Sequence, residues 1–132
     1  MTTTYLFYLV ALAFLTWLIW RWNRGAQRRR FRRAYPGPRD PAWQDADADF
    51  LEAFERAYRL RPGMAWALPP DATPMSVYLT LYPEHCIYDD CEPTRFRAAL
   101  AARLGAVPPD ALTQPLAELA KRWRAAPERN PA

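Results

Sequence analysis

One apolar segment near the start of the chain constrains its fold more than any other feature. Residues Tyr5–Trp20 read YLFYLVALAFLTWLIW, and only Thr16 among them is polar. A helix that rises 1.5 Å per residue needs about 20 residues to cross the ~30 Å hydrocarbon core of a bilayer. Together with its flanking residues the segment reaches this length, so it predicts a transmembrane helix over residues 1–23.

Aromatic side chains mark both ends of this segment, with Tyr5 and Tyr8 at the start and Trp17, Trp20 and Trp22 at the end. Trp and Tyr concentrate at the two membrane interfaces because their rings are amphipathic. A cleaved signal peptide would need a charged region before the segment and a small-residue cleavage site after it. A buried soluble helix needs apolar residues on one face only, and an interfacial helix needs a polar face. A single membrane span fits better than these three alternatives.

Charge is distributed unevenly around this span. The first 33 residues contain seven arginines and no acid, whereas the other 99 residues carry 11 basic and 14 acidic side chains. Arg28, Arg29 and Arg30 form the centre of the basic cluster. The positive-inside rule therefore predicts a single-pass protein of the inner (cytoplasmic) membrane, with its N-terminus outside and its C-terminal domain in the cytosol. These arginines can attract anionic membrane lipid. A basic cluster alone is a weak indicator of nucleic-acid binding, which we do not expect.

The rest of the chain divides into a basic, Pro-rich linker over 24–43, a small domain over 44–126 and a tail over 127–132. Arginine outnumbers lysine 17 to 1, which is typical of a GC-rich bacterial genome. One helix is predicted over 45–61, a second over 93–104, and a last one that Thr113 caps, with Pro115 in its first turn. The first of these has an apolar face made of Phe50, Leu51, Phe54 and Tyr58.

Residues 75–82 are ambiguous between helix and strand. Thr73 and Pro74 are typical of a helix start, but alternating apolar residues also fit a strand. Because no second strand is evident, we favour a short helix. The sequence thus predicts a mainly α fold, with one transmembrane helix and a cytosolic bundle of three or four helices. The alternative is an α+β domain in which Ser76–Tyr82 is a strand.

One polar cluster could carry chemistry, and it contains His85, Cys86, Asp89, Asp90, Cys91 and Glu92. Its spacing lacks the CxxC pair of common zinc sites. A catalytic cysteine would need a histidine to activate it and a third group to orient that histidine, and the chain has only one histidine. A disulfide is disfavoured in the cytosol. No Gly-rich phosphate loop or hydrolase motif occurs elsewhere. We therefore expect no catalytic residue, metal or cofactor, and no enzymatic activity.

The stretch from Asp89 to Trp123 resembles the second half of an acyl carrier protein, and the likeness extends over residues 45–124. Asp89-Asp90-Cys91-Glu92 stands where that family has its Asp-Ser-Leu motif, and Val107-Pro108 matches its Val/Ile-Pro pair. The resemblance places Asp90 at the position of the serine that carries phosphopantetheine. Because a carboxylate cannot form that phosphodiester, the resemblance implies a carrier-like domain without its prosthetic group. It also implies that Asp89, Asp90 and Glu92 dock a partner with a basic surface.

These features predict a membrane-anchored, non-enzymatic adaptor whose cytosolic domain docks a protein partner. One alternative is a small bitopic accessory subunit, or an immunity-type protein, that acts on a membrane protein through its transmembrane helix. Another is a carrier-like protein of lipid or polyketide metabolism.

Overall fold

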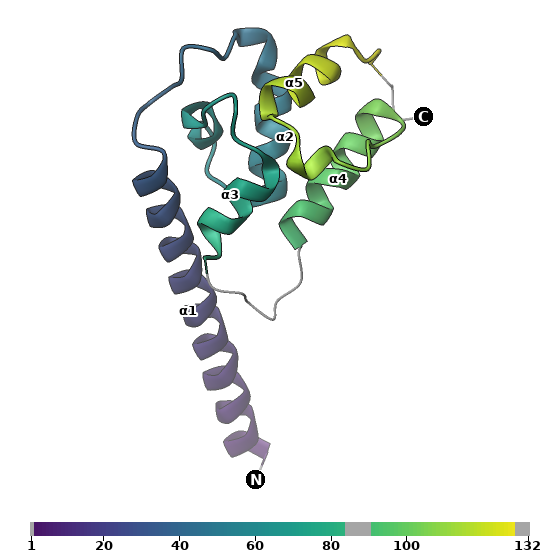
Figure 1. The fold of residues 1–132 in the computed structure, drawn as a ribbon. Helices are drawn as coiled ribbons and strands as arrows, with labels where there is room; N and C mark the ends of the chain where they lie inside the picture. The colour runs from purple at the N-terminus through teal and green to yellow at the C-terminus, as the bar shows by residue number, and fades with distance from the viewer. Residues whose placement is uncertain (1, 84–90, 129–132) are drawn as a thin grey trace.

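The computed structural model describes residues 2–83 and 91–128, and over these residues the chain contains five α-helices and no strand. The helices are α1 (Thr2–Ala34), α2 (Ala48–Tyr58), α3 (Pro74–Leu81), α4 (Cys91–Leu104) and α5 (Leu116–Ala125). The first half of α1 projects away from the bundle, and its second half lies beside α3 (Figure 1). The predicted mainly α fold is confirmed. The α+β alternative is wrong because residues 76–81 belong to α3.

The apolar half of α1 is fully exposed in the protein. The helix has 33 residues, which corresponds to a length of about 50 Å. Between Tyr5 and Trp22 its large apolar side chains are 45% to 73% exposed. By length and composition this helix could cross a membrane, although a signal sequence near an N-terminus would pass the same test. It is not the buried core helix of a soluble domain, because none of its apolar window is buried.

The second half of α1 replaces part of the predicted linker. Residues 24–34, which the sequence assigns to a basic linker, continue the helix, since arginine is a good helix former. Phe31 is only 1% exposed and belongs to the core of the bundle. Tyr35 packs on it with 5.0 Å between ring centroids. The helix therefore continues past residue 23, where the sequence predicts the start of the linker, and its second half packs with the bundle.

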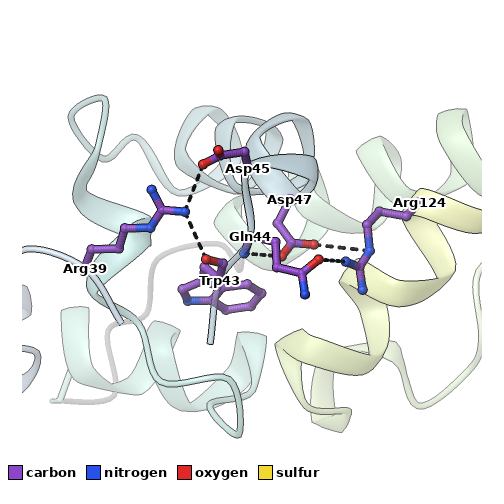
Figure 2. A network of polar contacts seen from close by, with 6 residues as sticks. All are labelled: Arg39, Trp43, Gln44, Asp45, Asp47 and Arg124. Carbon is purple, nitrogen blue, oxygen red and sulfur yellow. Dashed lines mark hydrogen bonds and ion pairs between the residues drawn. The ribbon is translucent and has the colours of Figure 1, made fainter. Parts of the chain in front are cut away.

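The segment between α1 and α2 runs along the domain and is tied to it. Trp43 is buried, and its Nε1 donates a hydrogen bond of 2.7 Å to the carbonyl of Leu68. The guanidinium of Arg39 lies 4.2 Å from the centre of the Trp66 ring. Arg39 also donates to the Trp43 carbonyl and contacts the Asp45 carboxylate at 3.1 Å (Figure 2).

A second part of this polar network joins the start of α2 to α5 (Figure 2). The buried Asp47 accepts a 2.9 Å hydrogen bond from the Gln44 backbone N–H, and its other oxygen lies 3.3 Å from Nε of Arg124. Arg124 in turn donates to the Gln44 side chain. Asp47 therefore satisfies the free Gln44 N–H group just before α2, and its contact with Arg124 holds α5 against this part of the chain.

Aromatic rings fill the core between α2 and α4. The apolar face of α2 is buried as predicted, and it consists of Phe50, Leu51, Phe54 and Tyr58. Phe96 of α4 packs edge-on against Phe54 with 5.0 Å between ring centroids, while Phe54 stacks on Tyr58 at 4.2 Å. The buried Tyr58 hydroxyl donates a 2.7 Å hydrogen bond to the Pro74 carbonyl. This bond fixes α3 against α2.

The predicted start of α3 is confirmed. The Thr73 hydroxyl accepts a 3.0 Å hydrogen bond from the Ser76 backbone N–H, and the Ser76 hydroxyl accepts one from the Thr73 N–H. Pro74 occupies the first helical position, where its missing N–H costs nothing. The cap thus decides between helix and strand for this ambiguous stretch.

The start of α5 differs from the prediction. Thr113 ends a short 3-10 turn (Ala111–Thr113), and its hydroxyl donates to the Asp110 carbonyl. It therefore does not cap α5, which begins at Leu116. The Leu116 backbone N–H instead donates a 2.8 Å hydrogen bond to the Ala72 carbonyl. A tertiary contact satisfies the free N–H group that a local cap was expected to bind.

Candidate functional site

A cavity of about 550 Å³ lies between the second half of α1, the end of α3 and the start of α4. Four arginines from three parts of the chain line it. Arg24 and Arg30 belong to α1, Arg59 directly follows α2, and Arg95 belongs to α4. Glu92 contributes a carboxylate to the described part of the lining. Guanidinium groups therefore outnumber carboxylates among the described lining residues.

The two α1 arginines are positioned by contacts on either side of the cavity. Arg24 lies over the ring of Trp20 at 4.9 Å from its centre. Burial, and then repulsion from Arg59, lowers the pKa of the Arg24 guanidinium below its ordinary value. Arg30 donates a 3.1 Å hydrogen bond to the carbonyl of Leu81, the last residue of α3. This bond satisfies a free carbonyl at the helix end and fixes the cavity wall.

Arg59 has an unusual backbone conformation. Its φ and ψ angles are 54° and 38°, in the left-handed region, and it ends α2. For a residue with a Cβ atom this conformation costs roughly 1–2 kcal/mol, and glycine is the usual residue at such a helix end. Arg59 thus brings a cation to the cavity although glycine would give a more stable backbone at this position.

Arg95 carries a buried donor without a hydrogen-bond partner. Its Nη1 atom is shielded from solvent and has no hydrogen-bond partner among the described residues, although Arg95 as a whole is half-buried. A buried charged donor is costly unless an acceptor satisfies it. Arg95 therefore brings an unsatisfied guanidinium donor to the set of residues that line the cavity.

Glu92 does not occupy the exposed docking surface that the sequence predicts. It is 6% exposed, and its Oε1 accepts a 2.7 Å hydrogen bond from the Tyr82 hydroxyl. Burial, followed by this hydrogen bond, raises the pKa of Tyr82. Glu92 faces inward because it lies in the first turn of α4, which packs against α3. The other two docking candidates, Asp89 and Asp90, lie outside the described residues.

The predicted anchor residues fall into two groups in the structure. Most of them point away from the bundle along the exposed part of α1, and these are Tyr5, Tyr8, Trp17, Trp22 and Arg29. Trp20, Arg28 and Arg30 instead contact or approach the domain. Trp20 and Arg30 line the cavity, and Arg28 is half-buried. Arg21 lies over the Trp17 ring at 5.3 Å from its centre.

The described residues contain no group of three or more metal-ligating side chains. Cys91 is half-buried and lines the cavity. His85 and Cys86, which the sequence places near it, lie outside the described residues. The chemistry that the described lining offers is binding of an anion by guanidinium groups, because these groups donate hydrogen bonds and remain charged.

A second, shallow groove of about 480 Å³ crosses α2, α4 and α5. Its floor is apolar and consists of Ala53, Ala57, Ala99 and Ala102. The other described lining residues are Arg56, Arg95, Arg103 and Trp123. Arg103 lies over the Trp123 ring at 5.7 Å from its centre. The groove therefore combines a flat apolar surface with a cationic edge.

Sequence reasoning did not identify Arg24, Arg59 or Arg95 as site residues. Trp20, Arg24 and Gln27 are spaced so that they share one face of a helix. Because the predicted helix ends at residue 23, the sequence does not indicate this common surface. No local pattern distinguishes Arg59 or Arg95 from other arginines. Only tertiary structure brings them together.

Neither a protein-family model, nor a curated protein, nor a solved structure gives a significant match to this chain. The resemblance to acyl carrier proteins therefore stays a prediction.

Proposed function

We propose that this protein is a single-pass, non-enzymatic membrane adaptor in which α1 both spans the membrane and forms part of the cytosolic domain. The burial of Phe31 in the bundle core carries this proposal. An anchor that served only as a tether would need no side chain in the core. Here one continuous helix connects the exposed apolar segment to the domain, so the domain is held at a set distance from the bilayer.

Contacts at the end of the apolar segment support this placement. Arg21 and Arg24 lie over the rings of Trp17 and Trp20. Aromatic rings of this kind prefer the membrane interface, and arginines prefer the cytosolic side. The bundle then begins directly at the membrane surface. Tethering of this kind raises the effective concentration of a binding domain near membrane-bound partners without any new contact.

We place partner docking on the groove across α2, α4 and α5. Its alanine floor can accept a packed apolar segment, while Arg56, Arg95 and Arg103 favour acidic side chains at its edges. We therefore propose an acidic amphipathic segment of a protein as the partner. The sequence-based alternative is a basic partner on Asp89 and Asp90, and reversal of both residues to Lys tests it separately.

The groove is tested by placing a carboxylate on its floor. Ala99→Glu should abolish capture of an acidic partner, because the new charge repels acidic residues and blocks apolar packing. Ala101→Glu is the matched control, since Ala101 is exposed on the same helix but does not line the groove. Both variants are expressed as full chains and crosslinked in membranes, and the crosslinked peptide is sequenced. Equal capture by both variants, or a basic crosslinked segment, would reject the groove as the docking site.

The accessory-subunit alternative predicts that the apolar segment itself carries specificity. Exchange of residues 5–20 for an unrelated spanning sequence should preserve function in an adaptor and abolish it in a subunit that acts through its helix. The carrier alternative predicts a pantetheine mass adduct after co-expression with a phosphopantetheinyl transferase. We expect no adduct, because the resemblance places Asp90 where the family has its serine.

A further inference from the structure

We propose that the arginine-lined cavity between α1, α3 and α4 binds the phosphate of an anionic phospholipid headgroup. The inference rests on the proposed membrane anchoring of α1. It goes beyond general attraction of a basic segment to a membrane, because it assigns a defined binding site with residues from three parts of the fold.

The charge of the described lining favours a phosphate. Arg24, Arg30, Arg59 and Arg95 surround the cavity, and the Glu92 carboxylate already accepts a hydrogen bond from Tyr82. The Nη1 atom of Arg95 is a buried donor that has no hydrogen-bond partner within residues 2–83 and 91–128. Guanidinium groups bind phosphate oxygens through short, charge-assisted hydrogen bonds, often two at a time. Cys91, the first residue of the 14-residue helix α4, also lines the cavity and brings the positive end of a helix dipole to it.

The position of the cavity favours a lipid as the source of this phosphate. Trp20, which lines the cavity, belongs to the aromatic end of the apolar segment. In a bilayer this ring lies at the depth of the headgroups. Arg24 and Gln27 follow on the same side of α1 and also line the cavity, so the cavity extends from that depth along the second half of α1. A headgroup phosphate can enter it while its acyl chains remain beside the apolar part of α1.

The backbone of Arg59 provides an independent means to test the site. Glycine should relieve the left-handed strain at this position and remove one cation at the same time. Arg59→Gly is therefore expected to fold at least as stably as the wild type but to bind the headgroup less well. If Arg59 had only a structural role, its substitution would not lower headgroup binding while the stability of the fold is kept.

The experiment measures lipid-dependent thermal stabilisation of the full chain in neutral detergent. Phosphatidylglycerol is compared with phosphatidylcholine, which carries the same phosphodiester with a compensating choline, and with inorganic phosphate. We expect saturable stabilisation by phosphatidylglycerol and a much smaller effect of the other two. An equal effect of phosphatidylcholine, or no stabilisation by any probe, would overturn the proposal. An equal effect of inorganic phosphate would overturn its assignment to a lipid.

Arg59→Gly and Arg95→Gln should each weaken the apparent affinity for phosphatidylglycerol by about tenfold or more, as expected for loss of a charge-assisted hydrogen bond. Arg97→Gln is the matched control, because Arg97 is exposed on α4 and does not line the cavity. Equal affinities in all three variants would reject the site. Alkaline extraction of membranes tests integration of each variant. Extraction of the wild type at alkaline pH contradicts the proposed anchoring. A wild type that is integrated but does not distinguish phosphatidylglycerol from phosphatidylcholine contradicts only the cavity.

Discussion

At the scale of single residues, Glu55 shows how a buried charge is tolerated in this small core. It is 6% exposed, and its carboxylate accepts a 3.0 Å hydrogen bond from the backbone N–H of Ala65. Burial raises the pKa of Glu55, and hydrogen bonds from Ala65 and Gly63 reduce this shift. The folded state thus binds a proton more tightly than the unfolded chain. Stability should increase as the pH falls from the raised pKa towards the ordinary value of 4.5.

Substitution of Glu55 separates its charge from its hydrogen bond. Glu55→Gln should be at least as stable as the wild type at pH 7 and should lose the gain in stability towards pH 5, because the amide keeps an acceptor for Ala65 but does not ionise. Glu55→Ala should lose about 1–3 kcal/mol of the free energy of unfolding, since it leaves the Ala65 N–H unsatisfied. Urea unfolding of the full chain in detergent, followed by tryptophan fluorescence, measures both. Destabilisation of Glu55→Gln at pH 7 would show that the charged form is favoured.

Gly25 lies in the interior of α1, where glycine is unfavourable. A Cβ atom there would meet only the flexible end of the Arg29 side chain, at 3.4 Å. Gly25→Ala should therefore raise the stability of the chain by about 0.5–1 kcal/mol, because alanine loses less backbone entropy in a helix. The thermal midpoint of the full chain measures this gain. A lower midpoint would mean that the helix requires the flexibility of glycine between anchor and domain.

At the scale of elements, the predictable parts of the fold are those with a strong local pattern. Phe50, Phe54 and Tyr58 repeat every four residues, and this repeat predicts the buried face of α2. The second half of α1 lacks such a repeat. It buries a single large residue, Phe31. The arginines around Phe31 predict a solvent-exposed linker. One buried side chain in a charged segment produces no periodicity, so only tertiary packing reveals it.

The candidate site was less predictable than the helices for the same reason. Arg24, Arg59 and Arg95 come from three separate segments, and each resembles the other arginines of the chain. Conversely, the sequence places Glu92 beside Asp89 and Asp90 and predicts a surface carboxylate. In the structure Glu92 is buried and accepts a hydrogen bond from Tyr82. Local sequence shows where charges are available. It does not show which of them the fold brings together.

The contact of α1 with the bundle depends on Phe31 more than on any charged residue of α1. Phe31→Ala should cost about 3–5 kcal/mol of the free energy of unfolding, as for other buried aromatic side chains. Arg32→Ala is the control, because Arg32 is exposed next to it on the same helix. Urea unfolding in detergent compares the two variants. A similar loss in both, or none in Phe31→Ala, would contradict the role of α1 as part of the domain.

At the scale of the whole molecule, the two halves of α1 differ in what surrounds their side chains. Its first part has exposed apolar side chains, and its second part packs on α3 and contributes to the core. Because α1 is one continuous helix, the proposed membrane span would carry the domain with it whenever it tilts or rotates. This coupling distinguishes the chain from a domain on a flexible tether. Under the proposed anchoring, it would also hold the arginine-lined cavity at a constant depth relative to the bilayer.

The predicted membrane orientation of the molecule rests on the distribution of arginines about its apolar segment. Arg29, Arg32 and Arg33 are exposed on α1, so their replacement by Gln should leave the packing of the bundle unchanged. Combined with Lys at positions 2–4, these changes should invert a substantial fraction of the molecules, because they remove the excess of positive charge that favours one side of the span. A C-terminal alkaline phosphatase fusion, active only outside the cytosol, measures this fraction. The wild-type fusion should be inactive, and the Lys substitutions alone should have an intermediate effect. An active wild-type fusion would contradict the predicted topology.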